Sequence, residues 1–252
     1  MSRRARNVLF LASAAGLAAL LAWALAGLPA PAEELRRYAG IVAGAAVEER
    51  HATNAVVITA FDYRALDTLG EEFLLFVAGV GTVALLRTQR GEAEERRARR
   101  LEEERGPATS DALRAFGSAL VAPCLLVGAY VVTHGHLTPG GGFQGGVVLA
   151  AALLLVYVTG RWVAMRRVRP HSLLEVAEAI GAGGFALVGL GGLIFAAAFF
   201  EDFLPLGSEG DLLSGGTIPL GNLAVGVEVG GVFALILSEL FDQMLLRRRE
   251  RP

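Results

Sequence analysis

Long apolar stretches alternate with shorter polar segments along the whole chain. Six stretches are close to the length that crosses the roughly 30 Å hydrocarbon layer of a bilayer as an α-helix, although the second and fourth are short. They are residues 8–28, 72–86, 116–132, 145–160, 173–200 and 223–246. The pattern predicts an all-α, polytopic membrane protein with about six transmembrane helices.

The composition supports this prediction. Of the 252 residues, 54% are hydrophobic and only 19% are charged, and the mean hydropathy of +0.51 is too high for an ordinary soluble domain. A formal net charge of −2 gives no indication of a nucleic-acid surface. The single cysteine, Cys124, lies in an apolar stretch, so we expect a packing residue without a disulfide partner in the chain.

The placement of arginine predicts how the helices are oriented. The chain has no lysine, and 23 arginines carry all of its basic charge. Only four of them fall in the segments 29–71, 133–144 and 201–222; these are Arg36, Arg37, Arg50 and Arg64. Because basic residues concentrate on the cytoplasmic side of a membrane, we expect both termini in the cytoplasm and these three segments outside.

The N-terminal region has two interpretations. Arginines, an apolar stretch and Ala24-Leu25-Ala26 also fit a secretory signal with a cleavage site after small residues. The apolar stretch is longer than the usual apolar region of a signal, so we favour a retained helix.

A polar segment rich in Arg and Glu divides the chain. Residues 92–105 predict an exposed helix with opposite charges three and four positions apart. We therefore expect a two-span module at 1–87, a charged cytoplasmic linker at 88–111 and a four-span module at 112–252. The linker is interpreted as a solvated connector, with docking of a cytoplasmic partner as the alternative.

Carboxylates within apolar stretches are functional candidates, because a charge in lipid is costly. Glu228 lies about two turns into the last stretch, between Gly226 and Gly230, whose spacing lets another helix approach closely. A proton or sodium site at Glu228 competes with simple pairing to a partner helix. Four other carboxylates near the ends of the last two stretches are interpreted as interfacial charges: Glu175, Glu178, Glu239 and Asp242.

The fifth apolar stretch carries a stripe of small residues. Gly181, Gly184, Gly191 and Gly192 fall on one face at helical spacing. Close contact between backbones holds helices together in lipid, so we expect these glycines to pack against another helix and to serve assembly.

The segment 133–146 is the most unusual part of the chain. Gly140, Gly141 and Gly142 follow Pro139 and permit backbone conformations that other residues resist. His134 and His136 lack a third ligand at useful spacing, so we favour a proton-relay or hydrogen-bonding role over a metal site. Neither a nucleophile motif nor a phosphate-binding motif is present, and we expect no catalytic residue, metal or cofactor.

Several motifs resemble a known family. Gly135-His-Leu-Thr-Pro-Gly-Gly-Gly-Phe-Gln-Gly-Gly146, Ser214-Gly-Gly-Thr-Ile-Pro-Leu-Gly-Asn222 and Val225-Gly-Val-Glu-Val229 are similar to the B subunit of Mrp-type multisubunit cation/proton antiporters, over about residues 112–246. Residues 54–71, with the span that follows, resemble the C-terminal end of the A subunit. The chain thus resembles a fusion of two antiporter pieces, without the long proton-pumping portion of the A subunit.

The resemblance implies a non-catalytic subunit of the bacterial inner membrane that works with antiporter subunits of the A, C, D, E, F and G types in exchanging Na+ for H+. By the same resemblance, an ion route or a subunit contact is expected at Pro139, Gly140, Gly141, Gly142 and Phe143. The A-subunit motif contributes Asp62, Arg64, Asp67, Thr68 and Glu71. Asp62 and Asp67 are interpreted as an external elbow paired with Arg64, or as the mouth of a cation path.

Two alternatives remain at this stage. The same module occurs in membrane-bound hydrogenases and in related complexes that share ancestry with respiratory complex I, so the chain could serve an ion-pumping redox complex. In such a complex it could also act as an adaptor that contributes contacts and no ion route.

Overall fold

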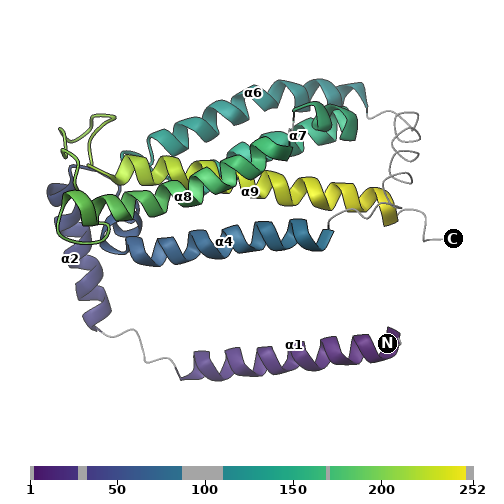
Figure 1. Ribbon diagram of the computed structural model, residues 1–252, viewed down its shortest axis with the longest axis horizontal. Coiled ribbons are helices and arrows are strands. Elements are labelled where there is room, and N and C mark those ends of the chain that lie inside the picture. The colour runs from purple at the N-terminus through teal and green to yellow at the C-terminus, as the bar shows by residue number, and fades with distance from the viewer. Residues whose placement is uncertain (1–2, 28–32, 87–109, 169–170, 248–252) are drawn as a thin grey trace. The chain divides into compact units, whose positions relative to one another are not determined.

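The computed structural model describes residues 3–27, 33–86, 110–168 and 171–247, and all regular structure in these ranges is helical (Figure 1). The elements are α1 (Arg3–Ala26), α2 (Glu33–Arg50), α3 (Ala55–Ile58), the π-helix η1 (Thr59–Tyr63), α4 (Ala65–Leu86), α6 (Asp111–Thr133), α7 (Gly142–Val168), α8 (His171–Phe195) and α9 (Ile218–Arg247). The predicted linker at 88–111 lies almost wholly outside the described residues.

Four of the described helices are long and apolar enough to cross a membrane: α4, α6, α8 and α9. Two others contain shorter apolar segments, Phe10–Ala26 in α1 and Gly142–Tyr157 in α7. These six segments coincide with the six apolar stretches of the sequence, so the prediction of an all-helical, multi-pass membrane protein is confirmed.

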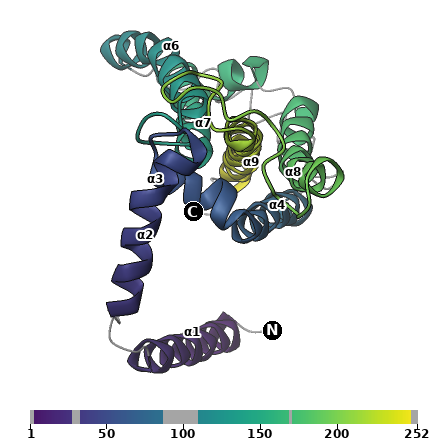
Figure 2. The same cartoon turned by 90° about the vertical axis from the view of Figure 1, so that its left-hand side faces the viewer.

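Helix α9 is the centre of the bundle that the described residues of the second compact unit, Gly44–Pro252, form. It contacts α4, α6, α7 and α8, which surround it in the view along the helices (Figure 2). More than half of its apolar window, 56%, is buried, against 11% for α4. Helices α4, α6 and α8 therefore expose broad apolar faces, as expected for surfaces that meet lipid or other subunits.

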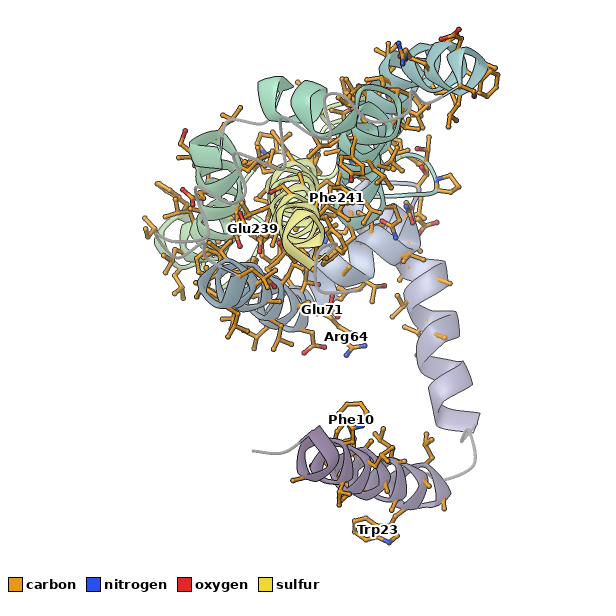
Figure 3. All side chains as sticks on the ribbon, turned by 90° about the vertical axis from the view of Figure 1, so that its right-hand side faces the viewer. Phe10, Trp23, Arg64, Glu71, Glu239 and Phe241 are labelled. Carbon is orange, nitrogen blue, oxygen red and sulfur yellow. The ribbon has the colours of Figure 1, made fainter. Side chains whose placement is uncertain are left out.

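Met1–Ala43 is a first compact unit, and its helix α1 is described by itself. In α1, Phe10 and Trp23 point to opposite sides of the helix and are 70% and 77% exposed (Figure 3). A helix that is apolar all round is typical of a segment surrounded by lipid.

The structure differs from the predicted elements at two places. Residues 29–71 were expected to form a connection, yet they contain α2, α3, η1 and the first seven residues of α4. The apolar stretch predicted at 173–200 ends as a helix at Phe195. After this residue the chain folds back, Phe200 adopts a φ of 63°, and its N–H donates a hydrogen bond to the carbonyl oxygen of Gly189 at 3.1 Å. The small residues of α8 leave room for this return.

Candidate functional site

The glycine-rich loop joins α6 to α7 at the end of the bundle where α9 begins. Gly140 and Gly141 have φ angles of 136° and 149°, which L side chains rarely adopt. The N–H of Gly142, at the start of α7, donates to Oδ1 of Asn222 in α9 at 2.9 Å. A Cβ on Gly142 would lie 2.6 Å from the carbonyl oxygen of Asn222, so only glycine permits this approach. The loop is thus locked to the central helix.

Asn54 fastens the same loop from the other side. Its Nδ2 group donates to the carbonyl oxygens of Gly135 at 2.8 Å and Thr138 at 2.9 Å, with a longer contact to Gly140 at 3.3 Å. The N–H groups of Thr53 and Asn54 both donate to the carbonyl oxygen of His136 at 3.1 Å. We call residues 53–54 with the loop 134–141 the clasp. It ties the segment before α3 to the α6–α7 connection.

The Oδ1 atom of Asn54 also caps a helix. It accepts hydrogen bonds from the N–H groups of Val56 and Val57, which makes Asn54 the N-cap of α3. Asn54 is the first residue of the segment 54–71 that resembles the A subunit, but the sequence alone assigned it no role. An asparagine directly before an apolar run is a helix-start signal, and that signal was available.

The two loop histidines point to different surroundings. His136 is fully buried and faces the backbone of Asp211 and Leu212, and burial lowers the pKa of its imidazole below 6.5. His134 is half-buried and stacks on Tyr130 with ring centroids 4.1 Å apart. Among the residues that the structure describes, no three His, Cys, Asp or Glu side chains are grouped to hold a metal ion. Pro139 is exposed at the tip of the loop, and Phe143 is half-buried in the first turn of α7.

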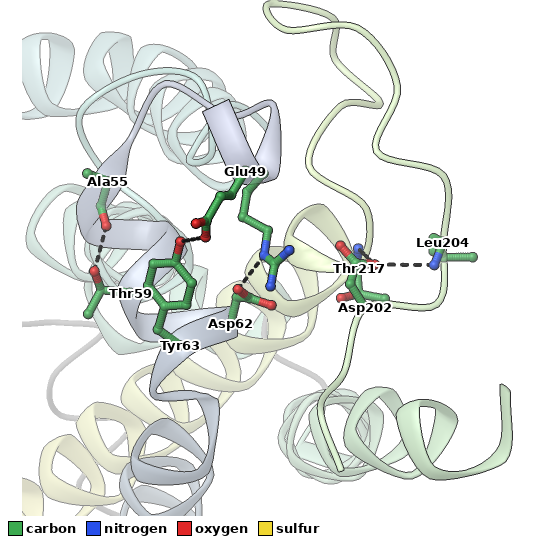
Figure 4. A network of polar contacts seen from close by, with 9 residues as sticks. Glu49, Ala55, Thr59, Asp62, Tyr63, Asp202, Leu204 and Thr217 are labelled. Atoms are coloured by element: carbon green, nitrogen blue, oxygen red, sulfur yellow. Dashed lines mark hydrogen bonds and ion pairs between the residues drawn. The ribbon is translucent and has the colours of Figure 1, made fainter. Parts of the chain in front are cut away.

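A polar network lies beside the clasp, between the end of α2 and η1 (Figure 4). Arg50 Nε contacts Asp62 Oδ2 at 2.5 Å, and Tyr63 donates a hydrogen bond to Glu49. Burial raises the pKa of Asp62, although Arg50 opposes this, and burial with the bond to Glu49 raises the pKa of Tyr63 to about 12. The expected pairing of Asp62 with Arg64 is therefore wrong, because the turn of α2 brings Arg50 closer.

The other residues of the A-subunit motif line an open cavity of about 330 Å³ on the outside of the bundle. Arg64 pairs with Asp67, with Nε 2.6 Å from Oδ2. Thr68 is buried, and its hydroxyl donates to the carbonyl oxygen of Ala60 at 2.7 Å. Arg64 and Glu71 lie on this side of the bundle (Figure 3), and both are exposed. The structure thus brings Arg64, Asp67, Thr68 and Glu71 together and places Asp62 elsewhere.

Four carboxylates are buried among the residues that the structure describes. Glu239 of α9, expected at the interface, is 5% exposed, and the other three lie on three different helices. Glu72 of α4, Glu178 of α8 and Glu228 of α9 are 1%, 3% and 0% exposed. Glu72 and Glu228 interact directly, and the charge of Glu228 acts on Glu178. Sequence reasoning selected Glu228 but missed Glu72 in favour of its neighbour Glu71, and it placed Glu178 at the interface. No pattern in one sequence shows which of two adjacent glutamates faces the bundle.

The six glycines expected to pack helices fall into three groups. A Cβ on Gly181 would lie 2.5 Å from Glu228, and one on Gly184 would lie 3.6 Å from Ala224, so both face α9. Gly226 faces the side chain of Val132 in α6, and Gly230 faces the start of α7. Gly191 and Gly192 receive Phe203 and the backbone of residues 198–201 instead of another helix.

Two sequence families match adjacent parts of the chain. Residues 112–235 match a domain related to the MnhB subunit of Na+/H+ antiporters, and residues 2–102 match MbhE, the E subunit of MBH. An uncharacterised protein of Methanocaldococcus jannaschii is 30% identical over 199 residues, covering 70% of this chain and 72% of that protein. The chain belongs to the MnhB and MbhE families. The resemblance to the B subunit and the A-subunit end of Mrp-type antiporters is confirmed.

Solved structures and a further relative agree with this assignment. A chain of the membrane-bound sulfane sulfur reductase, an archaeal respiratory complex, has a TM-score of 0.66 and 30% identity, covering 94% of this chain and 98% of that chain. A chain of the Mrp complex from Dietzia sp. DQ12-45-1b has a TM-score of 0.65 and 26% identity, covering 100% of this chain and 27% of that chain. A probable K+/H+ antiporter A/B subunit of Rhizobium meliloti is 29% identical over 206 residues, covering 73% of this chain. The MnhB–MbhE chain spans 20% of that relative's length.

Proposed function

We propose that this MnhB–MbhE chain is a non-catalytic membrane subunit of an Mrp-type complex that exchanges a monovalent cation for protons. The clasp is the observation that carries the proposal. It joins Asn54, within the MbhE match, to the loop at 134–141, within the MnhB match. Two pieces that match separate families are thereby held as one unit.

The proposal includes the surroundings of the chain. Broad exposed apolar faces on α4, α6 and α8 supply surface for contacts with antiporter subunits of the A, C, D, E, F and G types and for lipid. The arginine distribution supports placement in the bacterial inner membrane with both termini in the cytoplasm. In that orientation the clasp and the cavity beside Asp67 and Glu71 face outward, where acidic residues attract cations.

A second candidate is a membrane subunit of a redox complex. One observation favours it: the chain covers 98% of a subunit of the sulfane sulfur reductase but 27% of the Mrp chain. Both candidates share the fold and the clasp, and they differ in the proteins that accompany the chain.

Deleting the gene and restoring it on a plasmid tests the proposal. Inverted membrane vesicles are loaded with a fluorescent amine that reports the proton gradient, and Na+ or K+ is then added. We expect recovery of fluorescence in the restored strain and none in the deletion strain. Unchanged exchange in the deletion strain would contradict the antiporter assignment. Isolation of the tagged chain with iron–sulfur or hydrogenase subunits would favour the redox complex.

A further inference from the structure

Three of the buried carboxylates lie at successive depths in the bundle. At a rise of about 1.5 Å per residue, Glu72 lies about 10 Å from the start of α4 and Glu228 about 15 Å from the start of α9. Glu178 lies about 25 Å from the end of α8. These three helix ends are at the loop side of the bundle (Figure 1). The carboxylates therefore follow one another along the direction in which a proton would cross the membrane.

Close helix packing leaves room for these side chains and for little else. A Cβ on Gly79 would lie 2.2 Å from Oε1 of Glu178, and a Cβ on Gly181 would lie 2.5 Å from Cβ of Glu228. Glycine at these positions lets α4 and α8 approach the carboxylates of their neighbours. The remaining neighbours of Glu228 along α9, such as Val225 and Val232, are apolar and buried.

The burial of these carboxylates is not compensated by other charges or hydrogen bonds in the described part of the chain. Apart from the contact between Glu72 and Glu228, both oxygens of these two residues and Oε1 of Glu178 are buried without a hydrogen-bond partner there. The further titratable groups that act on them are acidic: Glu71 on Glu72 and Glu175 on Glu178. Carboxylates that face one another away from water cannot all be ionised, since each isolated charge would cost several kcal/mol.

We propose that Glu72, Glu228 and Glu178 form a proton relay within this chain, a role that rests on the proposed exchange function. In each step the O–H of a carboxylic acid is broken and an O–H bond forms on the neighbouring carboxylate, so that one proton moves and no electron does. Glu71 and Glu175 are both exposed, and they lie at the two ends of the row of buried carboxylates. A metal cation would need several more oxygen ligands than the apolar surroundings of Glu228 provide.

Substitution with glutamine in the intact complex tests the relay. Glu72→Gln and Glu228→Gln keep size and polarity but hold no transferable carboxyl proton. We expect each to lower cation-driven proton exchange at least tenfold while blue-native gels show an assembled complex. Glu209→Gln, in the exposed loop after α8, is the matched control and should leave exchange unchanged. Glu228→Asp keeps a carboxyl group and should retain part of the activity.

Infrared spectroscopy of the purified complex provides a readout that does not depend on transport. Protonated carboxyl groups in an apolar site absorb apart from ionised ones, and we expect Glu228→Gln to remove one such band that titrates with pH in the wild type. Wild-type exchange together with an unchanged band in Glu72→Gln and Glu228→Gln would overturn the relay. If the wild-type complex does not exchange cations but the band is lost in Glu228→Gln, the exchange function fails and the proton site stands.

Discussion

Asn54→Ala tests the clasp, because one side chain both caps α3 and holds the loop at 134–141. The substitution removes two close hydrogen bonds to loop carbonyl oxygens, at 2.8 and 2.9 Å, and the cap on the N–H groups of Val56 and Val57. A neutral hydrogen bond contributes about 1 kcal/mol, and an N-cap contributes about 1 kcal/mol. We therefore expect a loss of about 3 kcal/mol in the free energy of unfolding.

Thermal unfolding of the purified chain or complex in detergent measures this loss. For a chain of this size, a change of about 3 kcal/mol lowers Tm by roughly 6–12 °C. Asn54→Asp is the informative second variant, since it keeps the capping oxygen but places a carboxylate against the loop carbonyl oxygens. Ser118→Ala, an exposed position in α6 away from the clasp, serves as the control. If Asn54→Ala unfolds at the same temperature as Ser118→Ala, the clasp does not hold the two matched parts together.

Three further predictions use the same measurement. Gly142→Ala should destabilise the loop, because its Cβ would lie 2.6 Å from a carbonyl oxygen, whereas Gly183→Ala, with no atom within 4 Å, should not. Because the pKa of His136 is lower in the folded protein than its ordinary 6.5, the unfolded state binds the proton more readily. The free energy of unfolding should therefore fall as the pH drops below about 6.5. In His136→Gln this fall should be smaller. Arg50→Gln should cost roughly 2 kcal/mol, since it leaves the buried carboxylate of Asp62 without its partner, and Asp62→Asn in the same chain should recover part of that loss.

The transmembrane helices were predictable because lipid permits few alternatives. A backbone in hydrocarbon must satisfy its own hydrogen bonds, so long apolar stretches form helices whatever their neighbours are. The same constraint does not apply to the connections. Helices α2, α3 and η1 lie in a segment of mixed polarity, and the end of α8 at Phe195 depends on the residues that fold back over Gly189. These features require contacts between distant residues, which a hydropathy pattern does not contain.

The candidate site was predictable in its residue types but not in its pairings. The glycine loop and Glu228 stand out in the sequence for energetic reasons. A run of glycines loses much conformational entropy on folding, and a carboxylate in lipid is costly to bury. The predicted partner of Asp62, Arg64, was wrong. Arg50 becomes the partner only because the end of α2 turns back onto η1. Glu72 was missed for a similar reason: adjacent positions on a helix point about 100° apart, and only the packing of α9 against α4 decides which of the two is buried.

Helix α9 connects the clasp to the buried carboxylates. Asn222 receives the loop at the start of α9, and Glu228 lies less than two turns further along. Gly146 of α7 approaches α9 so closely that a Cβ on it would lie 2.7 Å from the Cβ of Val229 and 2.9 Å from the carbonyl oxygen of Gly226. The position of Glu228 opposite Glu72 therefore depends on α7 being seated against α9, and the loop determines how α7 begins. A change in the loop should reach the carboxylates through this helix, although the loop itself transfers no proton.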